Sequence, residues 1–227
     1  MALDLLIAGT GFNPSSDPVL LDHVPPVVEF LREDTSEWRF TTYDPEHRKP
    51  FNANTGWLFD FEDVRGYDSI IPRQYVDYMY LIQPQSELQY NRVSPIFDSG
   101  ALDSPLLDLL NVKYVITLRE IDNLGYTLVY DREVRVYRNE SVMQRAYALP
   151  VDCAFETSDF SVAIHHFDPR RHVILEPGSE EIGSSPISSP SSCLPLPAQI
   201  TGSSLNQVTV DVHASTPVFL ILADSYA

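Results

Sequence analysis

The chain closes on a run of apolar residues, and this run limits the possible folds more than any other feature. Val218–Ala223 is apolar almost throughout, which is typical of a strand covered on both faces. Because a core strand rarely ends a natural protein, we expect the chain to be part of a longer one. The missing strands would leave an open edge or an apolar surface near Gln207–Tyr226, through which copies of the chain are expected to self-associate.

The region after Pro150 is expected to be rich in β-structure. Within Pro177–Pro197, 12 of the 21 residues are Ser or Pro, a composition typical of a long loop or flexible linker. The other segments have the spacing of strands in a β-sandwich. We therefore predict a sandwich-like, incomplete β-rich domain at residues 151–227, with a Ser/Pro-rich loop at 177–197. Its predicted strands are His172–Glu176, Ala198–Gly202, Gln207–His213 and Val218–Ser225.

Residues 1–150 alternate between predicted strands and predicted helices. Each predicted helix has a proline at or near its first position, where proline is tolerated best; the helices are Pro25–Asp34, Pro72–Ile82 and Ser104–Asn111. The alternation indicates an α/β (α+β) domain with a mixed sheet. Two of its predicted strands, Tyr126–Tyr130 and Val134–Arg138, are expected to form a hairpin. The predicted strands are Asp4–Ala8, Trp38–Tyr43, Val112–Leu118, Tyr126–Tyr130, Val134–Arg138 and Arg145–Leu149.

The charge of the chain excludes two classes of partner. With 15 basic and 32 acidic residues, the formal net charge is −17. Nucleic-acid binding needs clustered Lys and Arg, so we predict no nucleic-acid partner, and adhesion to anionic lipid is equally disfavoured. No stretch of the sequence approaches the roughly 20 apolar residues that a membrane helix needs.

Cys153 and Cys193 are the only cysteines in the sequence. Neither lies in a CxxC or Cys/His spacing typical of a metal site. A disulfide between them would be compatible with a location outside the cell. We nevertheless predict two unpaired thiols, because two cysteines do not form a disulfide framework in a chain of this size.

Planar polar groups and aromatic rings are concentrated between residues 52 and 75. Sugars and lipid-linked sugar phosphates are held by amides, carboxylates and Arg forks above aromatic faces. The competing interpretation is structural, because the two asparagines suit a turn and Arg65 can pair with Asp63 or Asp68 to hold the loop. The candidate ligand-binding residues are Asn52, Asn54, Asp63, Arg65, Tyr67, Asp68, Arg73 and Tyr75.

Other chemistries lack the pattern they need. His165 and His166 are metal-capable and lie close to Asp168 and His172, but adjacent residues on a strand point to opposite faces. There is no Gly-x-Ser-x-Gly elbow and no complete dinucleotide fingerprint. No pair of acids is spaced so that the two face each other across a sugar, as glycosidase carboxylates do. We therefore predict no metal, no cofactor and no catalytic residue.

Three stretches, taken in order and spacing, resemble the large extracytoplasmic region of the YfhO family of bacterial multi-spanning membrane proteins. These stretches are Asp63–Tyr75, Leu106–Leu118 and Val218–Ala227. The Asn-x-Asn segment Asn52–Asn54 and the Arg-Ala-aromatic segment Arg145–Tyr147 also match the family pattern. The family looks like lipid-linked-sugar glycosyltransferases of the C superfamily.

The resemblance implies a non-catalytic extracytoplasmic domain of a polytopic membrane glycosyltransferase. Such a domain would position an acceptor glycan or a polyprenyl-linked sugar beside the membrane-embedded part of the same polypeptide, on the extracytoplasmic face of a bacterial cell membrane. The family's catalytic acid is expected on a loop between membrane helices, and no residue here matches it. The full-length parent would be the enzyme, and this region alone would not.

Two other functions stay open at this point. The chain could be a structural or protein-interaction domain without a ligand. A test of glycan binding would distinguish that function from the positioning of a glycan. It could also be a stand-alone carbohydrate-active enzyme. Turnover of a chromogenic glycoside by the isolated chain would favour that second alternative.

Overall fold

The computed structural model of the chain describes residues 23–68, 70–84, 92–166, 168–175, 193–204 and 206–224, together with Asp17 and Val19. The chain divides into two compact units, Met1–Thr35 and Ser36–Ala227. The predicted strand Asp4–Ala8 and most of the Ser/Pro-rich loop lie outside the described residues. The predicted division at residue 150 stays a prediction.

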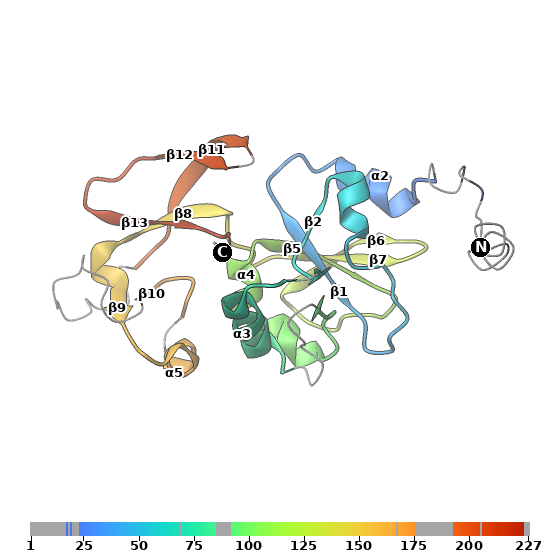
Figure 1. The fold of residues 1–227 in the computed structure, drawn as a ribbon, viewed down its shortest axis with the longest axis horizontal. Coiled ribbons are helices and arrows are strands. Elements are labelled where there is room, and N and C mark those ends of the chain that lie inside the picture. The colour runs from blue at the N-terminus through green and yellow to red at the C-terminus, as the bar shows by residue number, and fades with distance from the viewer. Residues whose placement is uncertain are drawn as a thin grey trace, which may run out of the picture. The chain divides into compact units, whose positions relative to one another are not determined.

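The first unit contains helix α2, Pro26–Arg32, which confirms the helix predicted from Pro25 (Figure 1). Pro26 stands at the first helical position, where its missing N–H has no partner to lose. Three apolar residues at helical spacing, Val27, Val28 and Leu31, are buried. The periodicity of the sequence therefore determines this helix.

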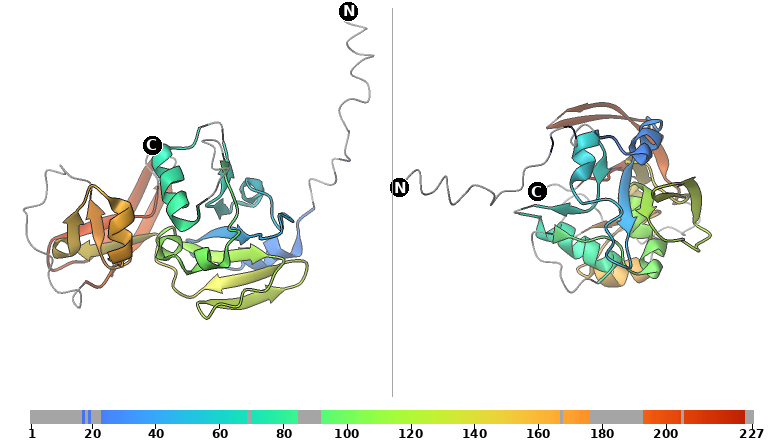
Figure 2. Two further views of the ribbon diagram at one scale, coloured as in Figure 1. Left: turned by 90° about the horizontal axis from the view of Figure 1, so that it is seen from below. Right: turned by 90° about the vertical axis from the view of Figure 1, so that its right-hand side faces the viewer.

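The second unit is built around a five-stranded mixed sheet in the order β2-β1-β5-β7-β6 (Figure 1). Strand β1 lies parallel to β2 and β5, whereas β5, β7 and β6 are antiparallel. The hairpin β6–β7 forms one edge of the sheet (Figure 2). These observations confirm the predicted mixed sheet. The bounds are β1 Arg39–Tyr43, β2 Glu62–Asp63, β5 Val112–Thr117, β6 Tyr126–Asp131 and β7 Arg135–Asn139.

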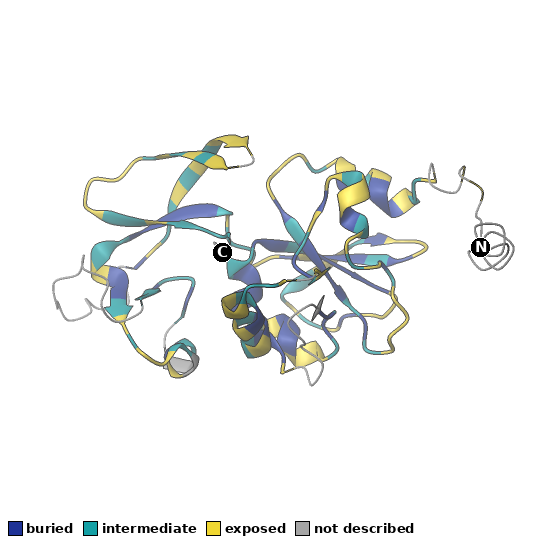
Figure 3. Cartoon of the chain, viewed as in Figure 1, coloured by how far each residue is buried: buried dark blue, intermediate teal, exposed yellow. Residues whose placement is uncertain are grey.

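Two helices supply the core that packs with this sheet. Helix α3 is Arg73–Ile82 and helix α4 is Pro105–Leu109. The Ser104 hydroxyl accepts a hydrogen bond from the Leu106 amide at 3.4 Å, and Asn111 ends the turn in the left-handed conformation, with φ of 60°, as the sequence predicts. Buried side chains of α3, α4, β5 and β7 form one cluster, dark blue in Figure 3.

Short elements connect the sheet to these helices. The 3-10 helix η2, Thr55–Phe59, follows the predicted loop, and η3 is Ser99–Asp103. Strands β3, Gly66–Tyr67, and β4, Arg92–Val93, form a separate antiparallel pair. The segment from η2 to α3 therefore supplies β2, the edge strand of the five-stranded sheet, and then β3, which belongs to the separate pair.

The C-terminal half contains a four-stranded antiparallel sheet in the order β12-β11-β8-β13 (Figure 1). Strand β8, on the N-terminal side of the expected boundary at residue 150, pairs with both β11 and β13. A parallel pair, β9–β10, follows it in the chain, with η4 before β9 and helix α5 between the two strands. The bounds are β8 Ala146–Pro150, η4 Val151–Cys153, β9 Ala154–Glu156, α5 Phe160–His166, β10 Val173–Leu175, β11 Leu196–Ser204, β12 Gln207–Val212 and β13 Val218–Leu222.

Two expectations about this half are wrong. Strand β13 is not covered on both faces: four of its residues are half-buried and Leu220 is exposed. An apolar run shows which residues favour burial and does not show how much of the strand the fold covers. His165 and His166 belong to helix α5 and not to a strand. The self-association expected of the β13 edge stays a prediction.

The cysteines are not free thiols, which corrects the sequence-based prediction. Cys153 and Cys193 form a disulfide with their Cα atoms 5.7 Å apart, and both residues are buried. The pairing joins η4 to the segment just before β11 across 40 positions of sequence. Spacing along the chain could not show this, because the fold alone brings the two positions together.

Within the described ranges, no helix has the length and apolar character needed to cross a bilayer.

Candidate functional site

A cavity of about 660 Å³ opens beside the edge of the five-stranded sheet. One wall is the segment Glu62–Asp68, which contains β2 and β3, and another is the first half of α3. The end of α4 and residues of β8 and β13 close the remaining sides. The volume is in the range of small-molecule sites, and its lining is largely apolar with a few polar groups, as such sites commonly are.

Six of the eight candidate residues line this cavity, and two do not. Asn52 and Arg73 are outside it, and Arg73 is an exposed partner of Asp77 within α3, with 3.5 Å between Nε and Oδ2. The candidate residues therefore lie around this cavity, and their role as a ligand site stays a prediction. The six lining residues are Asn54, Asp63, Arg65, Tyr67, Asp68 and Tyr75.

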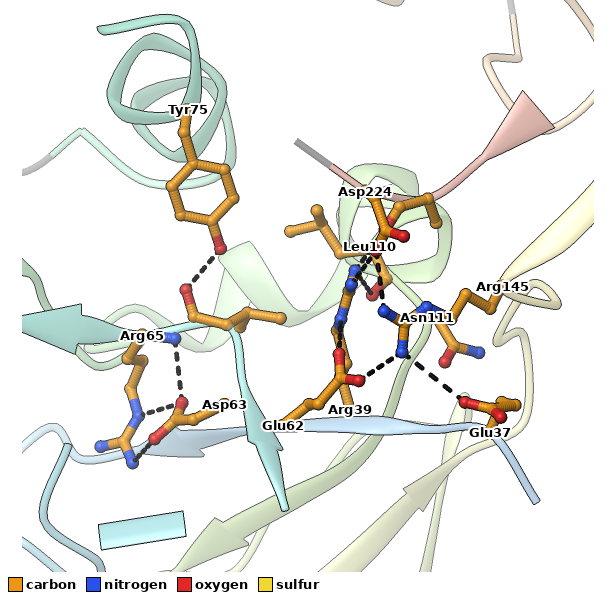
Figure 4. A network of polar contacts seen from close by, with 12 residues as sticks. Glu37, Arg39, Glu62, Asp63, Arg65, Tyr75, Leu110, Asn111, Arg145 and Asp224 are labelled. Atoms are coloured by element: carbon orange, nitrogen blue, oxygen red, sulfur yellow. Dashed lines mark hydrogen bonds and ion pairs between the residues drawn. The ribbon is translucent and has the colours of Figure 1, made fainter. Parts of the chain in front are cut away.

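Arg65 and Asp63 form a buried ion pair at the cavity wall (Figure 4). Both side chains are only 2% exposed. The Arg65 Nη2 donates to Asp63 Oδ2 at 2.7 Å and Nε donates to Oδ1 at 3.0 Å, while Nη1 donates to Thr42 Oγ1 at 2.6 Å and to the Phe51 carbonyl at 3.1 Å. Burial raises the pKa of the Asp63 carboxyl, and the Arg65 charge opposes that shift. This pair holds the loop, as the structural interpretation requires.

Two tyrosines of α3 also use their hydroxyl groups within the protein. Tyr75 donates to the Val64 carbonyl (Figure 4) and Tyr78 donates to the Leu106 carbonyl at 2.8 Å. Burial raises the pKa of both phenols above the ordinary value. Both residues line the cavity, so their rings contribute apolar surface. Their hydroxyls attach α3 to the backbone at Val64 and Leu106 of the same chain.

An aromatic rim borders the cavity, formed by Trp57 and Tyr67. Asn54, in the left-handed conformation with φ of 65°, binds the backbone of Tyr67 twice: its Nδ2 donates to the carbonyl at 2.7 Å, and its Oδ1 accepts from the amide at 3.2 Å. This pairing attaches η2 to β3. Trp57 is 78% exposed and Tyr67 62% exposed, so two rings at the cavity are accessible to a ligand.

Four charged residues that the sequence did not single out form a closed ring next to the cavity (Figure 4). We call Arg39, Glu62, Arg145 and Asp224 the charge ring. Arg39 Nε donates to Glu62 Oε2 at 2.8 Å and its Nη2 donates to Asp224, while Arg145 donates to Glu62 and, at 2.9 Å, to Asp224 Oδ1. Each carboxylate is thus shared between the two guanidinium groups, and each guanidinium between the two carboxylates.

The charge ring connects the two sheets. Its members come from β1, β2, the residue before β8 and the segment after β13, and three of them line the cavity: Arg39, Glu62 and Asp224. The four pairs in the ring are separated by 23, 79, 83 and 185 positions. Arg145 and Asp224 lie in segments that carry the family resemblance, but that resemblance does not pair them with each other or with Arg39 and Glu62. No local sequence pattern could therefore have identified the ring.

The charge ring lowers the pKa of Glu62. Burial alone would raise that pKa, but the hydrogen bonds and positive charges of Arg145 and Arg39 outweigh it. The same contacts raise the pKa of Arg145 against the effect of its burial. Glu62 is therefore held ionised more firmly in the folded chain than in the unfolded one.

We expect this shift to make stability fall in acid. A carboxyl whose folded pKa is depressed stabilises the fold above its unfolded pKa, here near 4.5, and loses that contribution as pH falls through the folded pKa. Asp63 and Asp108, whose pKa values burial raises, act in the opposite direction. Urea unfolding between about pH 3 and pH 7 should therefore compare the parent chain with Glu62→Gln. The difference in unfolding free energy should shrink below about pH 4.5, and a difference that does not change with pH would contradict the assignment.

Comparisons with known proteins add no family to this description. No family model matches the chain, and no curated protein or solved structure is significantly similar to it. In the described part of the chain, no group of three or more His, Cys, Asp or Glu side chains could hold a metal ion. The function is therefore argued from the cavity and its surroundings.

Proposed function

We propose that this chain is the extracytoplasmic, non-catalytic region of a YfhO-like polytopic membrane glycosyltransferase, and that its cavity positions an acceptor glycan or a lipid-linked sugar. The observation that carries the proposal is the cavity of about 660 Å³, in which Trp57 and Tyr67 present exposed rings above a lining with amide and carboxylate groups. Sugar rings stack their apolar faces on aromatic side chains, while their hydroxyls bind planar polar groups.

The disulfide supports the extracytoplasmic location. Cys153 and Cys193 pair in the folded chain, and structural disulfides persist in oxidising compartments such as the cell exterior and the periplasm. The net charge of −17 disfavours binding to the anionic lipid surface itself. Both properties suit a domain that lies outside the cytoplasm and faces a neutral ligand.

The arrangement of the acids supports a binding role over catalysis. Glu62 and Asp224 each bind two arginines, and Asp63 binds Arg65. A glycosidase needs one carboxyl with a raised pKa to donate a proton across the substrate from a second. The charge ring lowers the pKa of Glu62, and Asp63, whose pKa burial raises, is only 2% exposed and has both carboxylate oxygens bound to Arg65. Saturable turnover of a chromogenic glycoside that is lost with a single acid would favour the enzyme alternative.

A purely structural or protein-interaction role is the second candidate. It is favoured by the exposure of Leu58, which follows Trp57 in η2, and of Ile70, which are 72% and 83% exposed. Apolar side chains grouped on a surface commonly mark a protein contact. Glycan binding by the isolated chain separates the two candidates.

Trp57→Ala is expected to weaken glycan binding about tenfold, since the loss of one aromatic stacking surface costs roughly 0.5–1.5 kcal/mol beyond its buried area. Calorimetric titration with neutral tetrasaccharides of glucose, mannose and N-acetylglucosamine would measure the change. The melting temperature should stay within about 1–2 °C of the parent, because surface substitutions of exposed residues are nearly neutral.

Leu58→Ala is the matched control for this variant. Leu58 is the next residue of η2 and equally exposed, but it does not line the cavity. It should bind the same sugars as tightly as the parent chain. Equal losses in Trp57→Ala and Leu58→Ala, or no sugar binding by the parent chain, would count against the cavity as a glycan site.

A further inference from the structure

Tyr147 is a buried tyrosine of the central strand β8 that reaches the cavity. It pairs with Ile221 of β13 and Pro197 of β11, so strands on both sides fix its backbone. The residue is only 4% exposed, yet it lines the cavity together with Ile221 and Leu222. Its side chain is therefore held rigidly against an open space.

The hydroxyl of Tyr147 differs from those of Tyr75 and Tyr78 in having no hydrogen-bond partner among the residues that the structure describes. Tyr75 and Tyr78 donate to backbone carbonyls, whereas the described residues offer the Tyr147 hydroxyl no hydrogen bond. The Tyr147 oxygen is also not one of the side-chain atoms that lack both solvent exposure and a hydrogen bond, so it is accessible to solvent. It must then be in contact with the cavity, because a buried polar group otherwise costs about 1–3 kcal/mol.

Burial keeps this phenol protonated. It raises the pKa of Tyr147 to about 12, so the group stays neutral over the whole physiological range. A neutral phenol can donate one hydrogen bond and accept others, which matches a sugar hydroxyl in either direction.

We infer that the Tyr147 hydroxyl is the deep hydrogen-bonding anchor of the cavity and that the site selects a neutral, polyhydroxylated ligand over an anionic one. The inference rests on the proposed glycan-binding function and names the class of sugar. Tyr147 provides the polar contact at the β8–β13 wall, while the aromatic rim provides the stacking surface at the η2–β3 wall.

The charges of the cavity provide the selection against anions. Two arginines line it, Arg39 and Arg65, against four carboxylates: Glu62, Asp63, Asp68 and Asp224. Both arginines already bind carboxylates at close range. Arg145, which does not line the cavity, also binds Glu62 and Asp224, so these three arginines and four carboxylates leave one net negative charge. A phosphate or uronate entering the cavity would therefore meet that net negative charge and no guanidinium that is not already engaged, and like charges repel.

Tyr147→Phe tests the anchor, since it removes the hydroxyl and leaves the ring. We expect affinity for the best-bound neutral tetrasaccharide to fall about threefold to tenfold, as the loss of one hydrogen bond predicts. The melting temperature should not change, because no described residue forms a hydrogen bond with the hydroxyl. Tetragalacturonate, the anionic probe, should bind at least about tenfold more weakly than the neutral sugars to the parent chain.

Two further tyrosine variants make the result specific. Tyr78→Phe deletes a hydroxyl that is bonded to Leu106 and should lower the melting temperature, which shows that the assay detects a structural role. Tyr80→Phe, on the exposed side of α3 and outside the cavity, should leave sugar affinity unchanged.

The outcomes separate this inference from the proposed function. If a neutral sugar binds and Tyr147→Phe binds it equally well, or if tetragalacturonate binds as tightly, the glycan site stands and the inference is wrong. If no sugar binds the parent chain, the proposed function is wrong and the inference falls with it. A fall in the melting temperature of Tyr147→Phe comparable to that of Tyr78→Phe would also overturn the anchor, because it would show a structural partner for the hydroxyl.

Discussion

Arg65→Ala is expected to lower the free energy of unfolding by about 3–5 kcal/mol, as breaking a buried ion pair from one side does. The substitution leaves Asp63, whose side chain is 2% exposed, without its counter-ion, and removes the donors to Thr42 and the Phe51 carbonyl. For a chain of this length, the melting temperature should fall by about 6–20 °C. Urea unfolding followed by circular dichroism would measure both quantities.

Two comparisons define the cause of that loss. Arg73→Ala removes an exposed arginine that pairs with Asp77 one helical turn away, and it should change stability by less than about 0.5 kcal/mol. Asp63→Ala combined with Arg65→Ala should cost less than the sum of the single variants, because the second change removes the uncompensated charge left by the first. A stable Arg65→Ala that only loses sugar binding would show instead that Arg65 serves the ligand.

Replacing both cysteines by serine is expected to destabilise the chain by about 2–5 kcal/mol. The disulfide closes a loop of 40 positions that contains β9, α5 and β10, and the open chain gains conformational freedom chiefly in its unfolded state. The same loss should follow reduction with dithiothreitol, and hydrogen exchange would locate it.

The position of the loss is the more specific part of this prediction. Amide protection should fall first in β9 and β10, which make only a short parallel pair, while the five-stranded sheet stays protected, since local stability differs between parts of a fold. Uniform loss of protection across both sheets would contradict this. Unchanged stability after reduction would mean that the cysteines do not pair in solution.

Local elements of this fold could be predicted from sequence because their determinants are neighbours in the chain. Ser104, Pro105 and Asn111 define both ends of α4, and the paired apolar runs around the turn before Arg135 define the β6–β7 hairpin. Periodicity and capping act over a few residues. Such signals are legible without knowledge of the fold.

Features that depend on distant residues were not predictable in the same way. The disulfide and the charge ring join positions that only the tertiary fold brings together. Strand β8 was predicted as a strand, but its place between β11 and β13 depends on segments far downstream. A sequence pattern indicates which face of a strand is apolar and does not indicate which strand covers it.

The candidate site shows the same division. Residue type and proximity in sequence led to six residues that do line the cavity. Their roles were not separable, because an arginine that binds a ligand and one that binds a neighbouring aspartate look identical in a sequence. The structure distinguishes them by exposure: Arg65 is buried against Asp63, whereas Trp57 is exposed at the cavity. Trp57 and Tyr147, to which we assign roles in the proposed site, were not singled out because single aromatic residues carry no motif.

The central position of β8 also affects how the chain can fold as it is synthesised. Its two partners, β11 and β13, leave the ribosome long after it, since Ala146 pairs with Leu222 and Ala148 with Leu196. At about 5–20 residues per second, the buried residues Tyr147, Ala148 and Leu149 stay uncovered for several seconds while the five-stranded sheet can already assemble. During that interval strand β8 of the nascent chain is apolar and unpaired on both of its edges, so a chaperone that covers it would favour correct completion of the second sheet.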